Sequence, residues 1–201
     1  MSVIESQTPT KHRYSPGELL TLPNGKDYEL VDGELVERRM GWDSGWVAAQ
    51  LIYLLNAHCR RTSPHWINGP DAGYQCFPDD PGKVRKPDVS LVRLERMSPE
   101  QKPQGHCRIA PDLAVEVISP NDFYSEVVEK VAEYLSAKVR LVWVIDPATK
   151  SARVHRWDGT VTEVKAAETL DGEDVLPGFR CPLNELFRPP GAVGTGQTQS
   201  E

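Results

Sequence analysis

The chain has 201 residues, of which 39% are hydrophobic and 26% are charged, and its formal net charge is −6. These values are typical of one soluble globular domain. The apolar stretches are much shorter than the roughly 20 residues of a membrane span, and residues 1–13 lack the apolar core of a secretory signal. We therefore expect a cytoplasmic protein with no membrane partner. The negative charge argues against a broad basic surface for nucleic acid, although Lys83, Arg85 and Lys86 could form a local basic site.

The two ends of the chain differ in composition from its centre. Residues 1–13 and 188–201 are polar and unpatterned, so we expect them to be disordered tails that flank one folded domain over residues 14–187. The four cysteines show no C-x-x-C spacing, which favours free, mostly buried thiols over a zinc site.

The first half of the domain begins with a short helix after Ser15-Pro16, which ends near residues 23–25. Residues 28–37 contain two short apolar runs around Asp32-Gly33, which predicts a β-hairpin with a two-residue turn. Apolar residues at helical spacing predict a long helix over residues 44–61.

Strands dominate the rest of the domain. We expect a strand at residues 72–77 with an antiparallel partner at 84–92, followed by a polar surface connection over 93–111. An apolar strand around Glu116, a helix that ends near Lys138 and an apolar strand at 141–145 predict a parallel strand pair. Further strands are expected at 152–157 and 161–165, and segments 176–179 and 183–187 close the fold. The predicted class is α/β (α+β), with a mixed central sheet flanked by helices and extended by β-hairpins.

Two carboxylates lie in otherwise apolar strands. Asp88 follows Pro87 at the start of one strand, and Glu116 lies within Leu-Ala-Val-Glu-Val-Ile in the next. A carboxylate is normally excluded from such a strand unless a cation or hydrogen bonds compensate its desolvation. Neighbouring strands would bring the two acids together, and Mg²⁺ is often held by one or two carboxylates and several waters. The alternative is structural: Asp88 caps a turn, and Glu116 pairs with a nearby Lys or Arg.

These motifs resemble the restriction-endonuclease-like core, in which Asp follows Pro and Glu-x-Lys lies on the next strand. Here Ile118 occupies the lysine position, while Lys130 lies on the following helix. In this respect the chain is similar to the Uma-two family, described as putative restriction endonucleases, within the PD-(D/E)xK nuclease superfamily. The similarity covers about residues 14–187 and rests on these segments: Tyr28-Glu29-Leu30-Val31-Asp32-Gly33-Glu34-Leu35, Lys86-Pro87-Asp88-Val89, Val115-Glu116-Val117-Ile118-Ser119-Pro120, Lys130 with Tyr134, Trp143 with Asp146-Pro147, and Leu176-Pro177-Gly178-Phe179.

The resemblance implies a metal-dependent DNA endonuclease with Asp88, Glu116 and Lys130 as catalytic residues. Asp88, Glu116 and the main chain of Val117 would bind Mg²⁺, which Mn²⁺ can replace, and Lys130 would stabilise developing charge or orient the attacking water. Either of two further acids, Glu29 and Glu34, could serve as an auxiliary ligand. The alternative for Lys130 is an exposed ion pair with Glu126 four residues earlier on the helix.

Three functions can be compared at this stage. The favoured one is DNA cleavage, and a homodimer would provide two sites for the two strands of a duplex, with residues 152–187 as its contact. That segment could equally cover only the central sheet. A catalytically inactive DNA-binding or regulatory protein is the main rival, and metal-dependent nicking would separate the two. A two-carboxylate glycosidase has little support, because the chain has few aromatic residues and Trp143 lies within an apolar strand.

Overall fold

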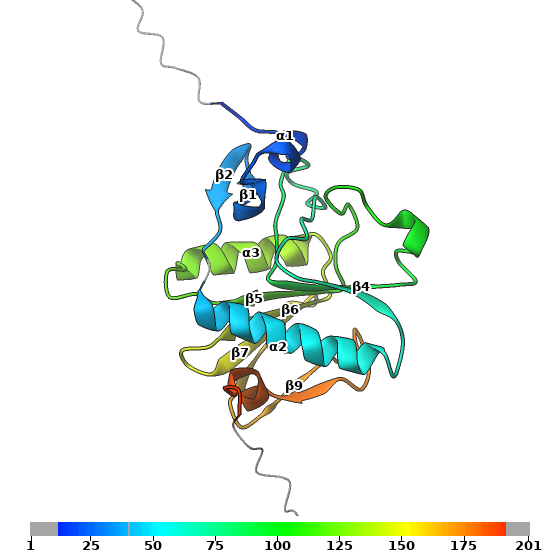
Figure 1. Ribbon diagram of the computed structural model, residues 1–201, viewed down its shortest axis with the longest axis vertical. Coiled ribbons are helices and arrows are strands. Elements are labelled where there is room, and N and C mark those ends of the chain that lie inside the picture. Colours follow the sequence, from blue (N-terminus) through cyan, green and yellow to red (C-terminus); the bar gives the residue numbers. More distant parts are fainter. Residues whose placement is uncertain (1–11, 40, 192–201) are drawn as a thin grey trace, which may run out of the picture.

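A six-stranded sheet forms the centre of the protein in the computed structural model, which describes residues 12–39 and 41–191 (Figure 1). Its order is β3-β4-β5-β6-β7-β8, in which β5 and β6 are parallel and all other neighbours are antiparallel. The mixed sheet confirms the predicted fold class. Its strands are β3 (His65–Asn68), β4 (Val89–Arg93), β5 (Leu113–Val117), β6 (Leu141–Asp146), β7 (Ser151–Arg156) and β8 (Val161–Lys165).

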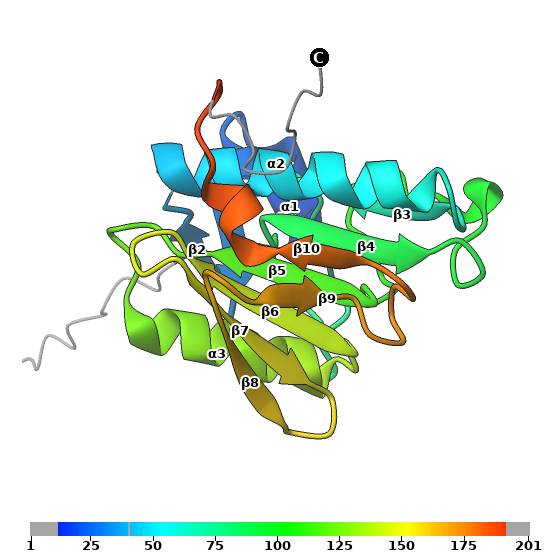
Figure 2. The same cartoon turned by 90° about the horizontal axis from the view of Figure 1, so that it is seen from below.

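Helices cover both faces of this sheet. Figure 2 shows α2 (Trp42–Cys59) on one face and α3 (Tyr124–Ser136) on the other. Two apolar clusters correspond to these layers, one between α2 and the sheet and one beneath α3. Because both faces are covered, every residue of β5 is buried, as is Trp143 in the neighbouring strand.

Smaller elements surround the sheet. A Ser15 capping box begins α1 (Pro16–Thr21), and Asp32 and Gly33 both have positive φ in the predicted hairpin turn. The hairpin and the remaining elements are β1 (Tyr28–Val31), β2 (Glu34–Glu37), β9 (Thr169–Asp171), β10 (Arg180–Pro182) and three 3-10 helices at Gly25–Asp27, Pro99–Gln101 and Leu183–Phe187.

The strand predicted at residues 72–77 is wrong. Tyr74 makes only isolated bridges, to Arg85 and Cys107, and β3 is the actual partner of β4. The predicted 84–92 strand is also divided, because Pro87 has no N–H to donate and β4 begins only after it. The result matters for the site, since the irregular segment before β4 directs Arg85 and Lys86 inward, where both are buried.

The connection over residues 93–111 lies less at the surface than predicted. Met97 and Cys107 are buried beside Tyr74 and Val92. Asp112, which is fully buried at the end of this connection, pairs with Arg93 and with the Arg96 guanidinium at 3.0 Å. The pairing ties the connection to the sheet.

Other predictions concern the chain as a whole. All four cysteines are free, and three of them are buried, as predicted. Among the described residues, no helix is long and apolar enough to cross a membrane. The predicted tails fall mostly on residues 1–11 and 192–201, which lie outside the described part of the chain.

Candidate functional site

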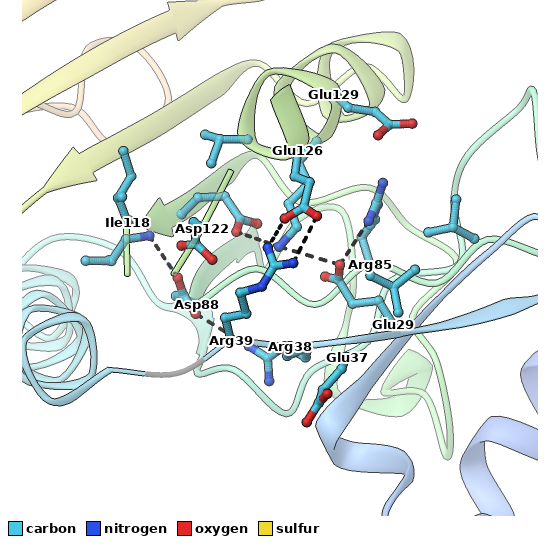
Figure 3. A pocket seen from close by; sticks show the side chains of 16 residues that line it. Glu29, Glu37, Arg38, Arg39, Arg85, Asp88, Ile118, Asp122, Glu126 and Glu129 are labelled. Carbon is cyan, nitrogen blue, oxygen red and sulfur yellow. Dashed lines mark hydrogen bonds and ion pairs between the residues drawn. The ribbon is translucent and has the colours of Figure 1, made fainter. Parts of the chain in front are cut away.

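Asp88 and Glu116 lie at neighbouring positions of two adjacent strands. Val89, the first residue of β4, pairs with Val115 of β5, so Asp88, just before β4, lies next to Glu116 of β5. Both line a pocket of about 190 Å³ together with Lys130 of α3. Figure 3 shows this pocket with Asp88 among its labelled lining residues. The sequence-predicted residues Asp88, Glu116 and Lys130 are therefore brought together.

Asp88 is held across the strand pair. Its Oδ2 accepts a hydrogen bond from the Val117 N–H at 2.8 Å, and a longer contact of 3.4 Å joins its Oδ1 to Arg38. The role of a simple turn cap is therefore wrong for this residue. Burial raises the pKa of the Asp88 carboxyl, although the Val117 hydrogen bond and the positive charges of Lys130 and Arg38 partly oppose the shift.

Glu116 has a partner for each of its carboxylate oxygens. Lys130 Nζ lies 3.0 Å from Oε2, and the Tyr134 hydroxyl donates to Oε1 at 2.7 Å. Burial raises the pKa of Glu116 to about 7, and the nearby negative charges of Asp88 and Glu29 act in the same direction. Together these effects outweigh the positive charge of Lys130, which lowers the pKa. Burial also raises the pKa of Tyr134 well above its usual value, so its hydroxyl stays protonated and can donate.

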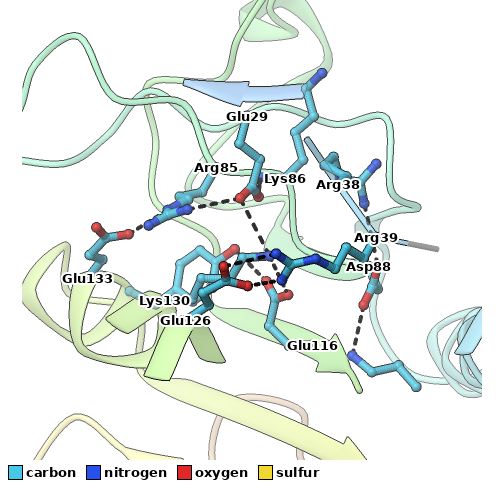
Figure 4. Close-up of polar contacts among 12 residues, drawn as sticks. Glu29, Arg38, Arg39, Arg85, Lys86, Asp88, Glu116, Glu126, Lys130 and Glu133 are labelled. Carbon is cyan, nitrogen blue, oxygen red and sulfur yellow. Dashed lines mark hydrogen bonds and ion pairs between the residues drawn. The ribbon is translucent and has the colours of Figure 1, made fainter. Parts of the chain in front are cut away.

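Lys130 does not form the exposed helical pair that was the alternative for it. Its Nζ contacts Glu116 at 3.0 Å and Glu29 at 3.5 Å, whereas Glu126 pairs with Arg39 (Figure 4). The predicted alternative is wrong because α3 packs with Lys130 and Tyr134 turned toward Glu116 of β5. The two carboxylates raise the pKa of Lys130 against the opposing effect of burial, so the amine is charged.

Glu29 is the second carboxylate in contact with Lys130. It is only 1% exposed, accepts from the Lys86 N–H at 2.7 Å and pairs with Arg85 at 3.0 Å. Burial alone would raise its pKa, but Lys130 and Arg85 outweigh that effect and lower it. Such contacts suit a residue that positions Lys130. The other auxiliary candidate, Glu34, is exposed and is not among the described residues that line the pocket.

Several site residues were not identified from the sequence. Arg38 and Arg39, which directly follow β2, both line the pocket. Two residues of the predicted local basic site are engaged in ion pairs: Arg85 joins Glu29 to Glu133, and Lys83 also pairs with Glu133. The basic run at 83–86 was a visible signal, but its partners depend on the tertiary fold.

The pocket carries an excess of negative charge. Seven acidic and four basic side chains line it, which gives a formal charge of −3: Glu29, Glu37, Asp88, Glu116, Asp122, Glu126 and Glu129 against Arg38, Arg39, Arg85 and Lys130. A phosphodiester is itself an anion, so it would be repelled unless a cation is bound.

The donor set fits a hard divalent cation. Among the described residues, no group of three or more His, Cys, Asp or Glu side chains is placed to hold a metal ion together. Two carboxylates with water and phosphate oxygens are nevertheless the usual protein environment of Mg²⁺. The Val117 N–H already donates to Asp88, so its carbonyl oxygen is the main-chain atom that could serve a cation.

Comparison with known structures gives a fold match. The crystal structure of a putative nuclease belonging to DUF820 from Anabaena variabilis is similar, with a TM-score of 0.72 and 17% sequence identity. The similarity covers 86% of this chain and 97% of the other. At that identity it establishes the fold, which confirms the expected nuclease-like architecture. None of the curated proteins matches the chain.

A family model identifies the chain more directly. The model named Uma2, with the description "Putative restriction endonuclease", matches residues 16–184. The match spans nearly the whole described domain and includes Asp88, Glu116 and Lys130. The chain therefore belongs to the Uma2 family.

Proposed function

We propose that this protein is a Mg²⁺-dependent DNA endonuclease, with Mn²⁺ as a possible substitute ion. One observation carries the proposal: Asp88, just before β4, and Glu116 of β5 line one pocket, and the Lys130 amine lies 3.0 Å from Glu116. Membership of the Uma2 family and the nuclease-like fold support a nuclease. The excess negative charge of the pocket favours a bound cation.

Each residue then has a role that follows from its position. Asp88, Glu116 and the Val117 carbonyl would hold the ion, which supplies charge stabilisation at the scissile phosphate and lowers the pKa of the attacking water. Lys130 would orient that water or stabilise developing negative charge. Glu29 and Tyr134 would keep Lys130 and Glu116 in place through the contacts described above.

Calorimetric titration with Mn²⁺ tests the metal site. We expect binding by the wild type and its loss in Asp88→Asn, whose amide oxygen can still accept from the Val117 N–H. Asp79→Asn is the matched control, because Asp79 is exposed and not among the described pocket-lining residues. Equal Mn²⁺ binding by the wild type and Asp88→Asn would contradict the proposed site.

Cleavage assays distinguish the enzyme from the non-catalytic alternative. With supercoiled and single-stranded DNA, we expect nicking or cutting that requires Mg²⁺ or Mn²⁺ and disappears in Asp88→Asn. Metal binding without cleavage of any tested DNA would favour an inactive DNA-binding or regulatory protein.

The proposed homodimer has weaker support from the packing. Residues between 152 and 187, including Val154, Leu170, Phe179 and Leu186, are buried in the main core, which is the behaviour of a segment that covers the sheet. The remaining candidate contact is the β8 edge, where Val161 is exposed. Light scattering tests the dimer: a mass near 22.5 kDa at micromolar concentration would contradict it.

A further inference from the structure

Three large aromatic side chains are exposed at one end of the sheet. Phe123 and Tyr124 begin α3 and are 62% and 70% exposed, and Trp42, at 90%, begins α2. Figure 1 shows these first turns of α2 and α3 at the same end of the sheet. Gly41, which precedes Trp42, lies against the Ser119 and Pro120 side chains of the loop that leads to Phe123. We call Trp42, Phe123 and Tyr124 the aromatic patch.

The aromatic patch adjoins the candidate active site. Phe123 and Tyr124 lie in sequence between Asp122 and Glu126, which both line the pocket. Arg39, another lining residue, places its guanidinium 4.7 Å from the centre of the Phe123 ring. A group bound on this ring would therefore be next to any phosphate in the pocket.

Two arginines lie over the rings of the patch, and one of them, Arg39, is also paired with Glu126. Arg39 covers one face of Phe123, and the Arg153 guanidinium lies 6.0 Å from the centre of the Tyr124 ring. The large exposed fractions of both rings leave area for a planar ligand. Aromatic faces beside arginines are the combination that binds single-stranded nucleic acid, because bases stack on the rings while the cations attract phosphates.

We infer that the aromatic patch stacks unpaired bases of a polynucleotide and so selects single-stranded or locally unpaired substrate for the neighbouring pocket. The inference rests on the proposed function, which makes that pocket the cleavage site, but base stacking can be measured without cleavage. In an intact duplex the base faces are stacked on one another, so the exposed rings could not reach them. The Arg153 guanidinium beside Tyr124 favours an anionic ligand over an apolar protein surface, whereas the charge of Arg39 is already paired with Glu126.

Fluorescence anisotropy with Ca²⁺ in place of Mg²⁺ tests the inference, because this hard cation can offset the negative charge of the pocket, and recovery of full-length probe afterwards shows that none was cleaved. The probes are a labelled ten-nucleotide oligothymidylate and an abasic oligonucleotide with the same number of phosphates. We expect the wild type to bind the base-containing probe about tenfold or more tightly than the abasic one. The double variant Phe123→Leu with Tyr124→Leu should lose most of this difference while keeping apolar side chains at both exposed positions.

Trp157→Ala is the matched control. Trp157 is also 70% exposed, but it follows β7. Its main-chain N–H donates to the carbonyl of Arg140, which precedes β6, so Trp157 lies at the end of the sheet away from Glu116. It should bind both probes as the wild type does, and unchanged melting temperatures would confirm that all variants fold. Equal wild-type affinity for the two probes, binding of neither, or an unaffected double leucine variant would overturn the inference. If the wild type self-associates, the double leucine variant does not, and neither shows base-dependent binding, the patch would be a protein contact.

The inference and the proposed function fail in different ways. Base-dependent binding without metal-dependent cleavage would contradict the proposed nuclease and leave the stacking surface in place. Cleavage of single-stranded DNA at the same rate by the wild type and the double leucine variant, with equal binding, would contradict the stacking surface and leave the nuclease in place.

Discussion

Replacing Lys130 with methionine is expected to slow metal-dependent cleavage by about 10²-fold or more, the scale of losing one transition-state donor. We also expect a loss of stability of about 1–3 kcal/mol, since Glu29 and Glu116 would lose a shared cation while both are nearly fully buried. If Lys130 instead formed an exposed pair with Glu126, its replacement would leave the melting temperature almost unchanged. The observed contacts therefore change the expected result of this substitution.

The two effects of Lys130→Met can be separated by a second variant. Combining it with Glu116→Gln neutralises the carboxylate that loses its cation, whereas Glu29 keeps Arg85, so part of the lost stability should return without recovery of cleavage. Lys165→Met is the control, because Lys165 is exposed on β8 and away from the pocket-lining residues described above. Single-turnover rates and thermal unfolding measure both effects, and wild-type cleavage by a folded Lys130→Met protein would exclude a role for Lys130 in chemistry.

Much of the fold could be predicted because its signals are local. The hairpin depends on Asp32-Gly33, whose positive φ values suit a tight two-residue turn. The order of strand, helix and strand from β5 through α3 to β6 follows from two apolar runs that enclose an amphipathic stretch. The same order explains why Glu116 and Lys130 could be placed near each other, since α3 directly follows the strand that carries Glu116.

The remaining features depend on contacts between distant parts of the chain. Glu29 reaches Arg85 and Lys130, and Arg38 reaches Asp88, in each case across at least 50 residues of sequence. No periodic pattern encodes such pairs. The edge strand β3 was missed because it has only four residues, His-Trp-Ile-Asn, which do not alternate between apolar and polar.

Glu116→Gln is expected to stabilise the metal-free protein and to abolish its activity. The pKa of about 7 for Glu116 lies above the usual glutamate value of 4.5, so the folded state holds this proton more tightly than the unfolded state does. The stability that Glu116 provides is complete below about pH 4.5 and is lost as the pH rises through about 7. Glutamine does not titrate, and its amide can still bond to Lys130 and to the Tyr134 oxygen.

The gain in the free energy of unfolding of Glu116→Gln over the wild type should therefore be small at pH 5. At pH 8 it should be about 2 kcal/mol, or roughly 4–8 °C in melting temperature. Cleavage should fall by about 10³-fold or more, because a neutral amide is a poorer ligand for a hard cation and the ion supplies several kcal/mol to the transition state. Glu163→Gln, on the exposed side of β8, should change neither quantity appreciably. Thermal unfolding at several pH values without divalent ions gives the measurement. A variant that is less stable than the wild type at pH 8, or one that cleaves normally, would show that Glu116 is a structural carboxylate whose burial serves the fold.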